Sequence, residues 1–124
     1  MTQALEDIQS TLNKPEPIYE NILEVADRLT SEDRRKQYGH PLDDFMCTAA
    51  LMTAVLKSAG LLDPTKEISP EMAELLMICT KISRLSRNTH HLDTITDIAG
   101  YARVMQLTTE ERQARWASAA KERK

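Results

Sequence analysis

Apart from Gly100, every glycine and proline lies between, or at the start of, stretches whose apolar residues recur at helical spacing. The chain of 124 residues has only three Gly and five Pro, and no stretch alternates apolar with polar residues as a half-buried strand does. Proline suits the first turn of a helix and glycine follows its end, so Pro41, Pro70 and Gly60 mark helix limits. The sequence therefore predicts an all-α protein, a compact bundle of about five to six helices.

Helical spacing also predicts how the chain is divided. We expect an N-terminal arm over residues 1–16 with a short helix at 4–12, a helical core domain over 17–107, and a polar C-terminal helix over 108–124. Within the core domain, helices are expected over 17–29, 41–59, 70–85 and 92–107. Thr108 and Glu111 form a capping box, which predicts the start of the last helix.

Apolar stripes along these helices predict the core and its partners. We expect two stripes to face the core: Leu75, Ile78, Ile82 and Leu85, and then Ile95, Ile98, Ala102 and Met105. The helix over 41–59 is apolar on both sides, which favours a central helix, a subunit interface, or some of each. Cys47 and Cys79 lie among apolar neighbours and are expected to be reduced core thiols. The sequence predicts a homo-oligomer.

Composition excludes several classes of function. The formal net charge of −3, with dispersed basic residues, argues against a nucleic-acid partner. No apolar run approaches the ~20 residues of a membrane span, and the first residues lack a signal-peptide pattern, so we expect a cytoplasmic protein. No Walker loop, dinucleotide fingerprint, nucleophile elbow or Cys-x-x-Cys motif occurs. No catalytic nucleophile is visible.

Acidic and basic groups at helical spacing are the best indication of chemistry. Asp93, Asp97 and Tyr101 are spaced by four and share one flank of their helix. Two carboxylates one turn apart can hold Mg²⁺, which takes its remaining ligands from water and phosphate. The alternative is that the two carboxylates pair with Lys81 and Arg84 on the preceding helix.

Two weaker candidates lie outside this helix pair. Glu71 and Glu74 have the i, i+3 spacing of metal-binding glutamates, although an acid in a first turn is also favoured by the helix dipole. His40, held between Gly39 and Pro41, is a candidate for ligand contact.

Three sequence blocks, taken in order, resemble a family of small phage-encoded proteins of unassigned function. They are Asp33-Arg34-Arg35-Lys36-Gln37-Tyr38-Gly39-His40-Pro41, Lys81-Ile82-Ser83-Arg84-Leu85, and Asp93-Thr94-Ile95-Thr96-Asp97-Ile98-Ala99-Gly100-Tyr101-Ala102. The chain is more distantly similar to the phage nucleotide-modification-associated domain. The resemblance covers about residues 22–105.

A further analogy reaches the MazG-type all-α nucleotide pyrophosphohydrolases. Those are Mg²⁺-dependent helical oligomers that cleave nucleoside triphosphates between the α- and β-phosphates, with a Glu-x-x-Glu on one helix and a Glu-x-x-Asp on another. This sequence has Glu71-x-x-Glu74, but its second acidic pair is Asp93-x-x-x-Asp97.

Three hypotheses follow. In the first, the protein handles a nucleotide, with hydrolysis left open: Asp93 and Asp97 hold Mg²⁺, while the ligand is met by Arg34, Tyr38, His40, Lys81, Arg84 and Tyr101. In the second, a non-enzymatic phage protein sequesters a nucleotide signal of host defence or binds a host protein. In the third, the charges form a salt-bridge network inside a structural homo-oligomer.

Overall fold

The computed structural model describes residues 20–123, without the side chains of residues 32–34. The first helical segment combines α2 (Ile22–Arg28), a π-helical turn η1 (Leu29–Asp33) and α3 (Arg34–Tyr38). It is followed by α4 (Pro41–Ser58), α5 (Pro70–Arg87) and α6 (Leu92–Glu122). The described residues contain no strand, so the all-α prediction is confirmed. The N-terminal arm, with its expected helix, lies outside the described residues.

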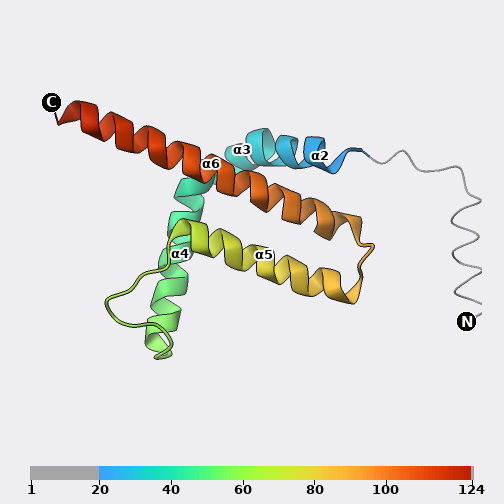
Figure 1. Ribbon diagram of the computed structural model, residues 1–124, viewed down its shortest axis with the longest axis horizontal. Helices are drawn as coiled ribbons and strands as arrows, with labels where there is room; N and C mark the ends of the chain where they lie inside the picture. The colour runs from blue at the N-terminus through green and yellow to red at the C-terminus, as the bar shows by residue number, and fades with distance from the viewer. Residues whose placement is uncertain (1–19, 124) are drawn as a thin grey trace, which may run out of the picture.

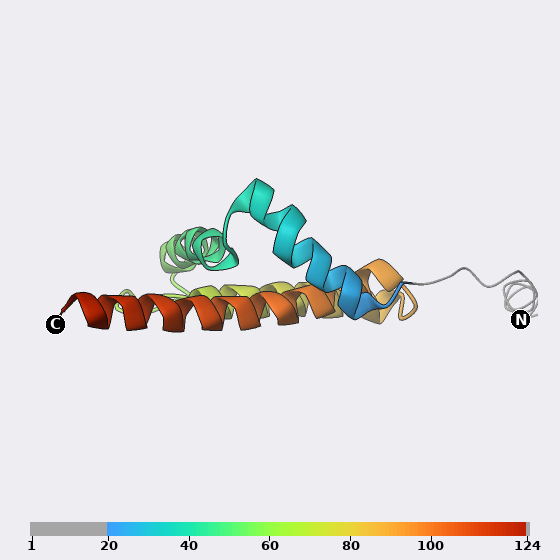
Figure 2. The same ribbon diagram turned by 90° about the horizontal axis from the view of Figure 1, so that it is seen from above.

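The helices form two layers (Figures 1 and 2). Antiparallel α5 and α6 make one layer, and α4 and the α2–α3 segment both cross its same face. α4 contacts both α5 and α6, whereas α2 contacts α6. In Figure 2 the opposite face of the α5–α6 layer has no described element over it. None of the described helices is both long and apolar enough to cross a membrane.

Side-chain caps and glycine fix the helix ends where the sequence predicts them. The Ser69 hydroxyl accepts the backbone N–H of Met72 at 3.1 Å, immediately before Pro70 begins α5. Gly39 and Gly60 have φ of +73° and +74°, a conformation that only glycine adopts readily. The N–H groups of Gly60 and Leu61 donate back to the last turn of α4, in the bonding pattern of a Schellman motif.

A small core lies where α4 crosses the α5–α6 layer. Its buried members are Phe45, Ala49, Ala73 and Val104. Tyr101 packs beside them, with its ring edge-on to Phe45 at a centroid distance of 6.2 Å, an arrangement that aromatic rings favour. This contact holds Tyr101 at the inner side of α6.

The predicted helix break at Thr108 is wrong, because α6 runs without interruption from Leu92 to Glu122. The Thr108 hydroxyl donates across the layer to Glu74, at 2.7 Å from one carboxylate oxygen, so it does not cap a helix. Glu111 instead accepts from Arg115, at 2.9 Å. No glycine or proline lies between residues 101 and 122 to stop the helix. Residues 20–123 form four helical segments, and because the expected helix over 4–12 lies outside them, the count of five to six helices stays a prediction.

The expected core stripe of α5 is also wrong in part. Leu75 and Ile82 are exposed, at 43% and 54%. Ala73 and Glu74, each 0% exposed, face the interior of the chain instead. The face that packs on α4 and α6 is thus offset around the helix from its most apolar side.

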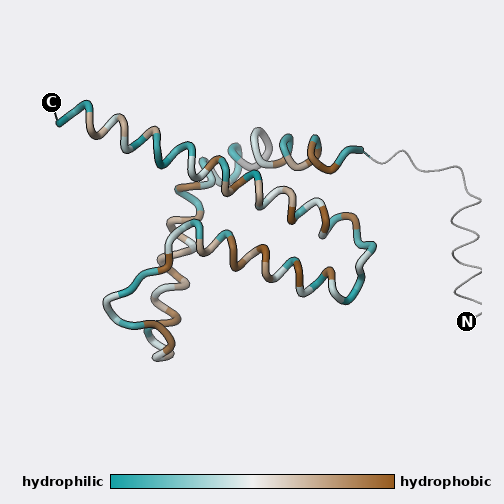
Figure 3. Tube along the Cα trace, in the orientation of Figure 1, coloured by the Kyte–Doolittle hydropathy of each residue, from teal (hydrophilic) through white to brown (hydrophobic). Residues whose placement is uncertain are grey.

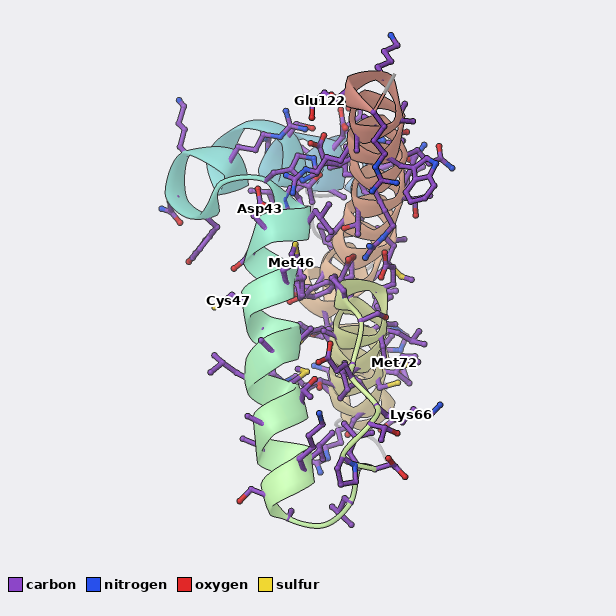
Figure 4. All side chains as sticks on the ribbon, turned by 90° about the vertical axis from the view of Figure 1, so that its left-hand side faces the viewer. Asp43, Met46, Cys47, Lys66, Met72 and Glu122 are labelled. Carbon is purple, nitrogen blue, oxygen red and sulfur yellow. The ribbon has the colours of Figure 1, made fainter. Side chains whose placement is uncertain are left out.

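α4 shows a similar one-sided burial. Leu51 and Val55 are exposed, so the helix is not central within this chain. Cys47, expected in the core, is exposed and points away from α5 and α6 (Figure 4). Cys79 is likewise exposed, on α5. Both thiols belong to helix faces that nothing in the described chain covers.

Candidate functional site

A pocket of about 290 Å³ opens between the α2–α3 segment and the α5–α6 layer. Its lining residues come from every helical segment except α4: Ala26, Leu29, Thr30, Gln37, Tyr38, Lys81, Thr96, Asp97, Gly100, Tyr101 and Val104. Four of them, Tyr38, Lys81, Asp97 and Tyr101, are candidates named from the sequence. The fold brings these four side chains together from segments distant in the chain.

Lys81 supplies the positive charge of the pocket. Its Nζ lies 3.0 Å from an Asp97 carboxylate oxygen, with side-chain exposures of 15% for Lys81 and 44% for Asp97. The Lys81 side chain is thus mostly buried, whereas that of Asp97 is partly exposed to water. This ion pair between α5 and α6 is the one expected if the carboxylates pair with basic residues of the preceding helix instead of binding a metal ion.

Gly100 lies in the pocket wall within α6. A Cβ placed on Gly100 would lie 3.9 Å from the Thr30 methyl carbon, which is ordinary van der Waals contact. Close helix packing therefore does not require glycine here. Because glycine in a helix interior costs about 1 kcal/mol relative to alanine, the sequence carries a less stable residue where alanine would fit. The effect of glycine is to keep the pocket open beside Asp97.

A second pocket adjoins the first. It has a volume of about 590 Å³ and shares Leu29, Thr96 and Asp97 with its neighbour, while adding Asp93 and Arg28. Asp97 therefore lies at the junction of the two pockets. Asp93, one helical turn earlier and exposed, opens only to the second pocket.

Of the other predicted ligand residues, Arg84 and His40 do not line the pocket. Arg84 is exposed on α5, three residues beyond Lys81. His40 caps α4, its Nδ1 accepting the Leu42 N–H at 3.0 Å, and its Nε2 lies 3.8 Å from Glu111. The side chain of Arg34 lies outside the described residues. His40 has a structural explanation, and its predicted ligand contact remains a prediction.

The four acidic residues predicted to bind metal fall in two places. Glu71 is held by Arg112 through two bonds of 2.7 and 3.0 Å, and this guanidinium lowers the pKa of the Glu71 carboxyl. Glu74 is fully buried and bonded to Thr108, so these two carboxylates point to different partners. Within residues 20–123, no group of three or more His, Cys, Asp or Glu side chains is placed to hold a metal ion.

Sequence reasoning missed part of the pocket. Thr30, Gln37 and Thr96 line it but carry no pattern that signals a ligand. Gln37 directly precedes Tyr38 in the first resembling block, which is the one local signal that could have indicated it. Helical spacing over residues 92–107 does not show which face of the helix lines a pocket, so it could not identify Thr96 as a lining residue.

Comparison with known proteins assigns the family. A domain of unknown function, DUF6378, matches residues 21–116. The chain belongs to this family. It is similar to the Gene 55 protein of Mycobacterium phage D29, with 40% identity over 92 residues, and to that of Mycobacterium phage L5, with 35% identity over 95 residues. The aligned region covers 74% of this chain and 56% of each relative. The chain thus spans about half the length of the curated relatives it matches.

These relatives confirm the expected resemblance to phage proteins of unassigned function. The link to nucleotide modification and the analogy to MazG-type enzymes remain predictions. No solved structure matches the chain.

Proposed function

We propose that this phage-type protein binds a small phosphate-bearing, nucleotide-like ligand in the pocket between the α2–α3 segment and the α5–α6 layer. The observation that carries the proposal is the convergence of Lys81, Tyr38 and Tyr101 on one pocket of about 290 Å³. Small-molecule sites combine apolar walls with convergent polar groups, and this pocket combines Ala26, Leu29 and Val104 with several polar side chains. The volume lies near the lower limit of such sites, which suits one nucleotide.

The ligand roles follow from the chemistry of each side chain. Lys81 presents an ammonium, a point-charge partner for phosphate, and its burial limits competition from water. Tyr38 and Tyr101 offer aromatic faces, on which every nucleobase can stack. The edge-on contact with Phe45 orients the Tyr101 ring. Asp97 would hold Lys81 in place before the ligand arrives.

Asp93 and Asp97 are the residues that would hold Mg²⁺. Two carboxylates suffice for this ion when phosphate oxygens and water complete its ligands. Asp97 lines the proposed pocket, and Asp93, one turn away, lines the adjoining one. Bound Mg²⁺ would neutralise phosphate charge and, in a pyrophosphohydrolase, activate water. The alternative function is sequestration of a host-defence nucleotide, or inhibition of a host protein, without catalysis.

Thermal unfolding with nucleoside triphosphates, cyclic nucleotides and inorganic pyrophosphate, each with and without Mg²⁺, tests the proposal. A ligand at 100 times its dissociation constant should add about 2.7 kcal/mol of stability. A shift that needs Mg²⁺ favours hydrolysis, to be checked by assaying nucleoside monophosphate and pyrophosphate. A shift without Mg²⁺ favours sequestration. No shift with any ligand would overturn the proposal.

A matched pair of variants ties binding to the pocket. Lys81→Met should abolish the ligand-induced shift, because it removes the pocket ammonium while keeping the length of the side chain. Arg84→Met, on the same helix but exposed, should leave the shift unchanged. Equal loss in both variants would place the ligand elsewhere.

A further inference from the structure

The α5–α6 layer exposes a continuous apolar face on the side away from α4 and α2. On α5, Ala73 and Met77 pack against the core, and helical spacing turns Leu75, Cys79 and Ile82 away from it. All three are exposed. Met72, also exposed, points away from α4 in Figure 4.

α6 contributes a matching stripe to the same face. Val104 and Leu107 are buried beneath the other layer, and helical spacing turns Ile95, Ile98 and Met105 away from it. These three are partly exposed, whereas Ala102, the other member of the predicted stripe, lies beside α2. Figure 3 shows apolar segments along both helices of the layer.

The register of the two helices aligns the stripes. Lys81 pairs with Asp97, and Glu74 with Thr108. This antiparallel register sets Leu75 about level with Met105, and Ile82 about level with Ile98. The two stripes, each expected to face the core, therefore form one face on the outside of the chain.

The only tryptophan of the chain extends this face. Trp116 is 72% exposed on the part of α6 that projects beyond α5 (Figures 1 and 2). The steps from Ile98 to Met105, to Thr109 and to Trp116 are of seven, four and seven residues, each close to whole helical turns, so Trp116 lies on the same side of α6. A large aromatic ring so exposed, in line with an apolar stripe, is typical of a binding surface.

We infer that a second copy of this chain covers the apolar face, so that two α5–α6 layers pack into a four-helix arrangement. The 18 residues of α5 span about 27 Å, and two helices side by side are roughly 20 Å wide. The flat area of about 500 Å² approaches the ~800 Å² per partner of a stable interface. The projecting end of α6 with Trp116 adds to it.

The distribution of charged residues also favours a second copy of this chain as the partner. From Leu75 to Thr80, α5 carries no charged residue, and neither does α6 from Ile98 to Ala102. The central part of the face, away from the exposed Glu71–Arg112 pair, has no charge to orient a charged partner, whereas a two-fold dimer joins identical patches. The 3–4 spacing of both stripes suits the near-antiparallel packing of helix bundles.

Burial within the single chain supports the need for a partner. Among the described residues, the buried apolar side chains are Ala26, Leu42, Phe45, Ala49, Ala73, Val104 and Leu107. Thirteen large apolar side chains are exposed over the same residues. The dimer face lies on the side of α6 opposite Gly100, so the second copy leaves the pocket open.

Sedimentation and Trp116 fluorescence over a range of protein concentrations test the inference. We expect a dimer mass at micromolar concentration, with Trp116 emission moving to longer wavelength as dilution separates the subunits. A monomer at every concentration, with Trp116 emission always that of a water-exposed indole, would overturn the inference.

A pair of charged variants locates the interface. Ile82→Glu should raise the dimer dissociation constant at least tenfold, while Leu51→Glu, on the exposed side of α4, should leave it unchanged. If Ile82→Glu does not fold by circular dichroism, Leu75→Glu, at another exposed position of the same face, replaces it. Dissociation by Leu51→Glu alone would assign the interface to α4 and overturn the inference.

Discussion

The hydroxyl of Thr108 on α6 donates to the carboxylate of Glu74 on α5, at 2.7 Å from one oxygen and 3.1 Å from the other. Both side chains are completely buried. A buried carboxylate is costly unless hydrogen bonds satisfy its oxygens, so this contact makes the polar interior of the α5–α6 layer tolerable.

Thr108→Val should lower the free energy of unfolding by about 1–3 kcal/mol. Valine preserves the shape of the side chain but removes a donor from a buried acceptor, which is the costly way to lose a hydrogen bond. Chemical denaturation followed by circular dichroism measures the change.

The neighbouring threonine is the control. Thr109 is exposed, and its hydroxyl donates to the Met105 carbonyl of its own helix at 2.9 Å. Thr109→Val should change stability by no more than about 0.5 kcal/mol. Equal losses in the two variants would contradict a special role for the bond to Glu74.

Gly100→Ala should raise the free energy of unfolding by up to about 1 kcal/mol, because the added methyl meets only ordinary contact with Thr30. The same methyl reduces the pocket beside Asp97, so the ligand-induced stabilisation should weaken. Thermal unfolding with and without ligand measures both effects.

Gly60→Ala should have the opposite effect on the free energy of unfolding. Gly60 has a φ of +74°, where a side chain costs roughly 1–2 kcal/mol, and Gly60 does not line the pocket. It should lose stability and keep the ligand-induced shift. Destabilisation by Gly100→Ala would show instead that α6 needs glycine for packing.

The Glu71–Arg112 pair should make stability depend on acidic pH. Bonding to Arg112 lowers the pKa of Glu71 from its ordinary value of 4.5. The stabilisation is therefore complete above pH 4.5 and is lost as the pH falls through the lower folded-state pKa. Because the pair is partly exposed, its contribution lies within about 1 kcal/mol.

Denaturation midpoints measured between about pH 6 and pH 2.5 check this dependence. This pH range extends roughly two units to either side of an ordinary glutamate pKa. Glu71→Gln should fall less steeply on the acid side than the wild type. Glu110→Gln, at an exposed position on α6, is the control and should follow the wild-type curve. Matching curves for all three proteins would contradict a role for Glu71.

Local signals predicted the helix limits well. Ser69, Pro70, Gly39 and Gly60 act through the backbone of their own turn, and such chemistry is readable from neighbouring residues. The predicted helix break at Thr108 was wrong because a tertiary hydrogen bond outweighs the local capping-box pattern. Glu74, 34 residues away, takes the hydroxyl that the local pattern assigned to the cap.

The candidate site was predictable to a similar extent. Lys81, Asp97 and Tyr101 belong to two helices joined by a short turn, so their proximity follows from neighbouring sequence. Thr30 and Gln37 reach the pocket only because the α2–α3 segment docks from far along the chain. Arg84 is on the helix of Lys81, but three residues leave it about 60° short of a full helical turn, and it is exposed to water.

The two walls of the pocket differ in how far apart along the chain their residues lie. α5 and α6 are joined by a turn of four residues, between Arg87 and Leu92, so their pairing closes a short loop and costs little entropy. The other wall, carrying Thr30 and Tyr38, is more than 40 residues from Lys81 along the chain and pairs through a much longer loop. A chain caught before that docking would already hold Lys81 against Asp97, yet it would present them on an open helical hairpin with no recess to enclose a ligand.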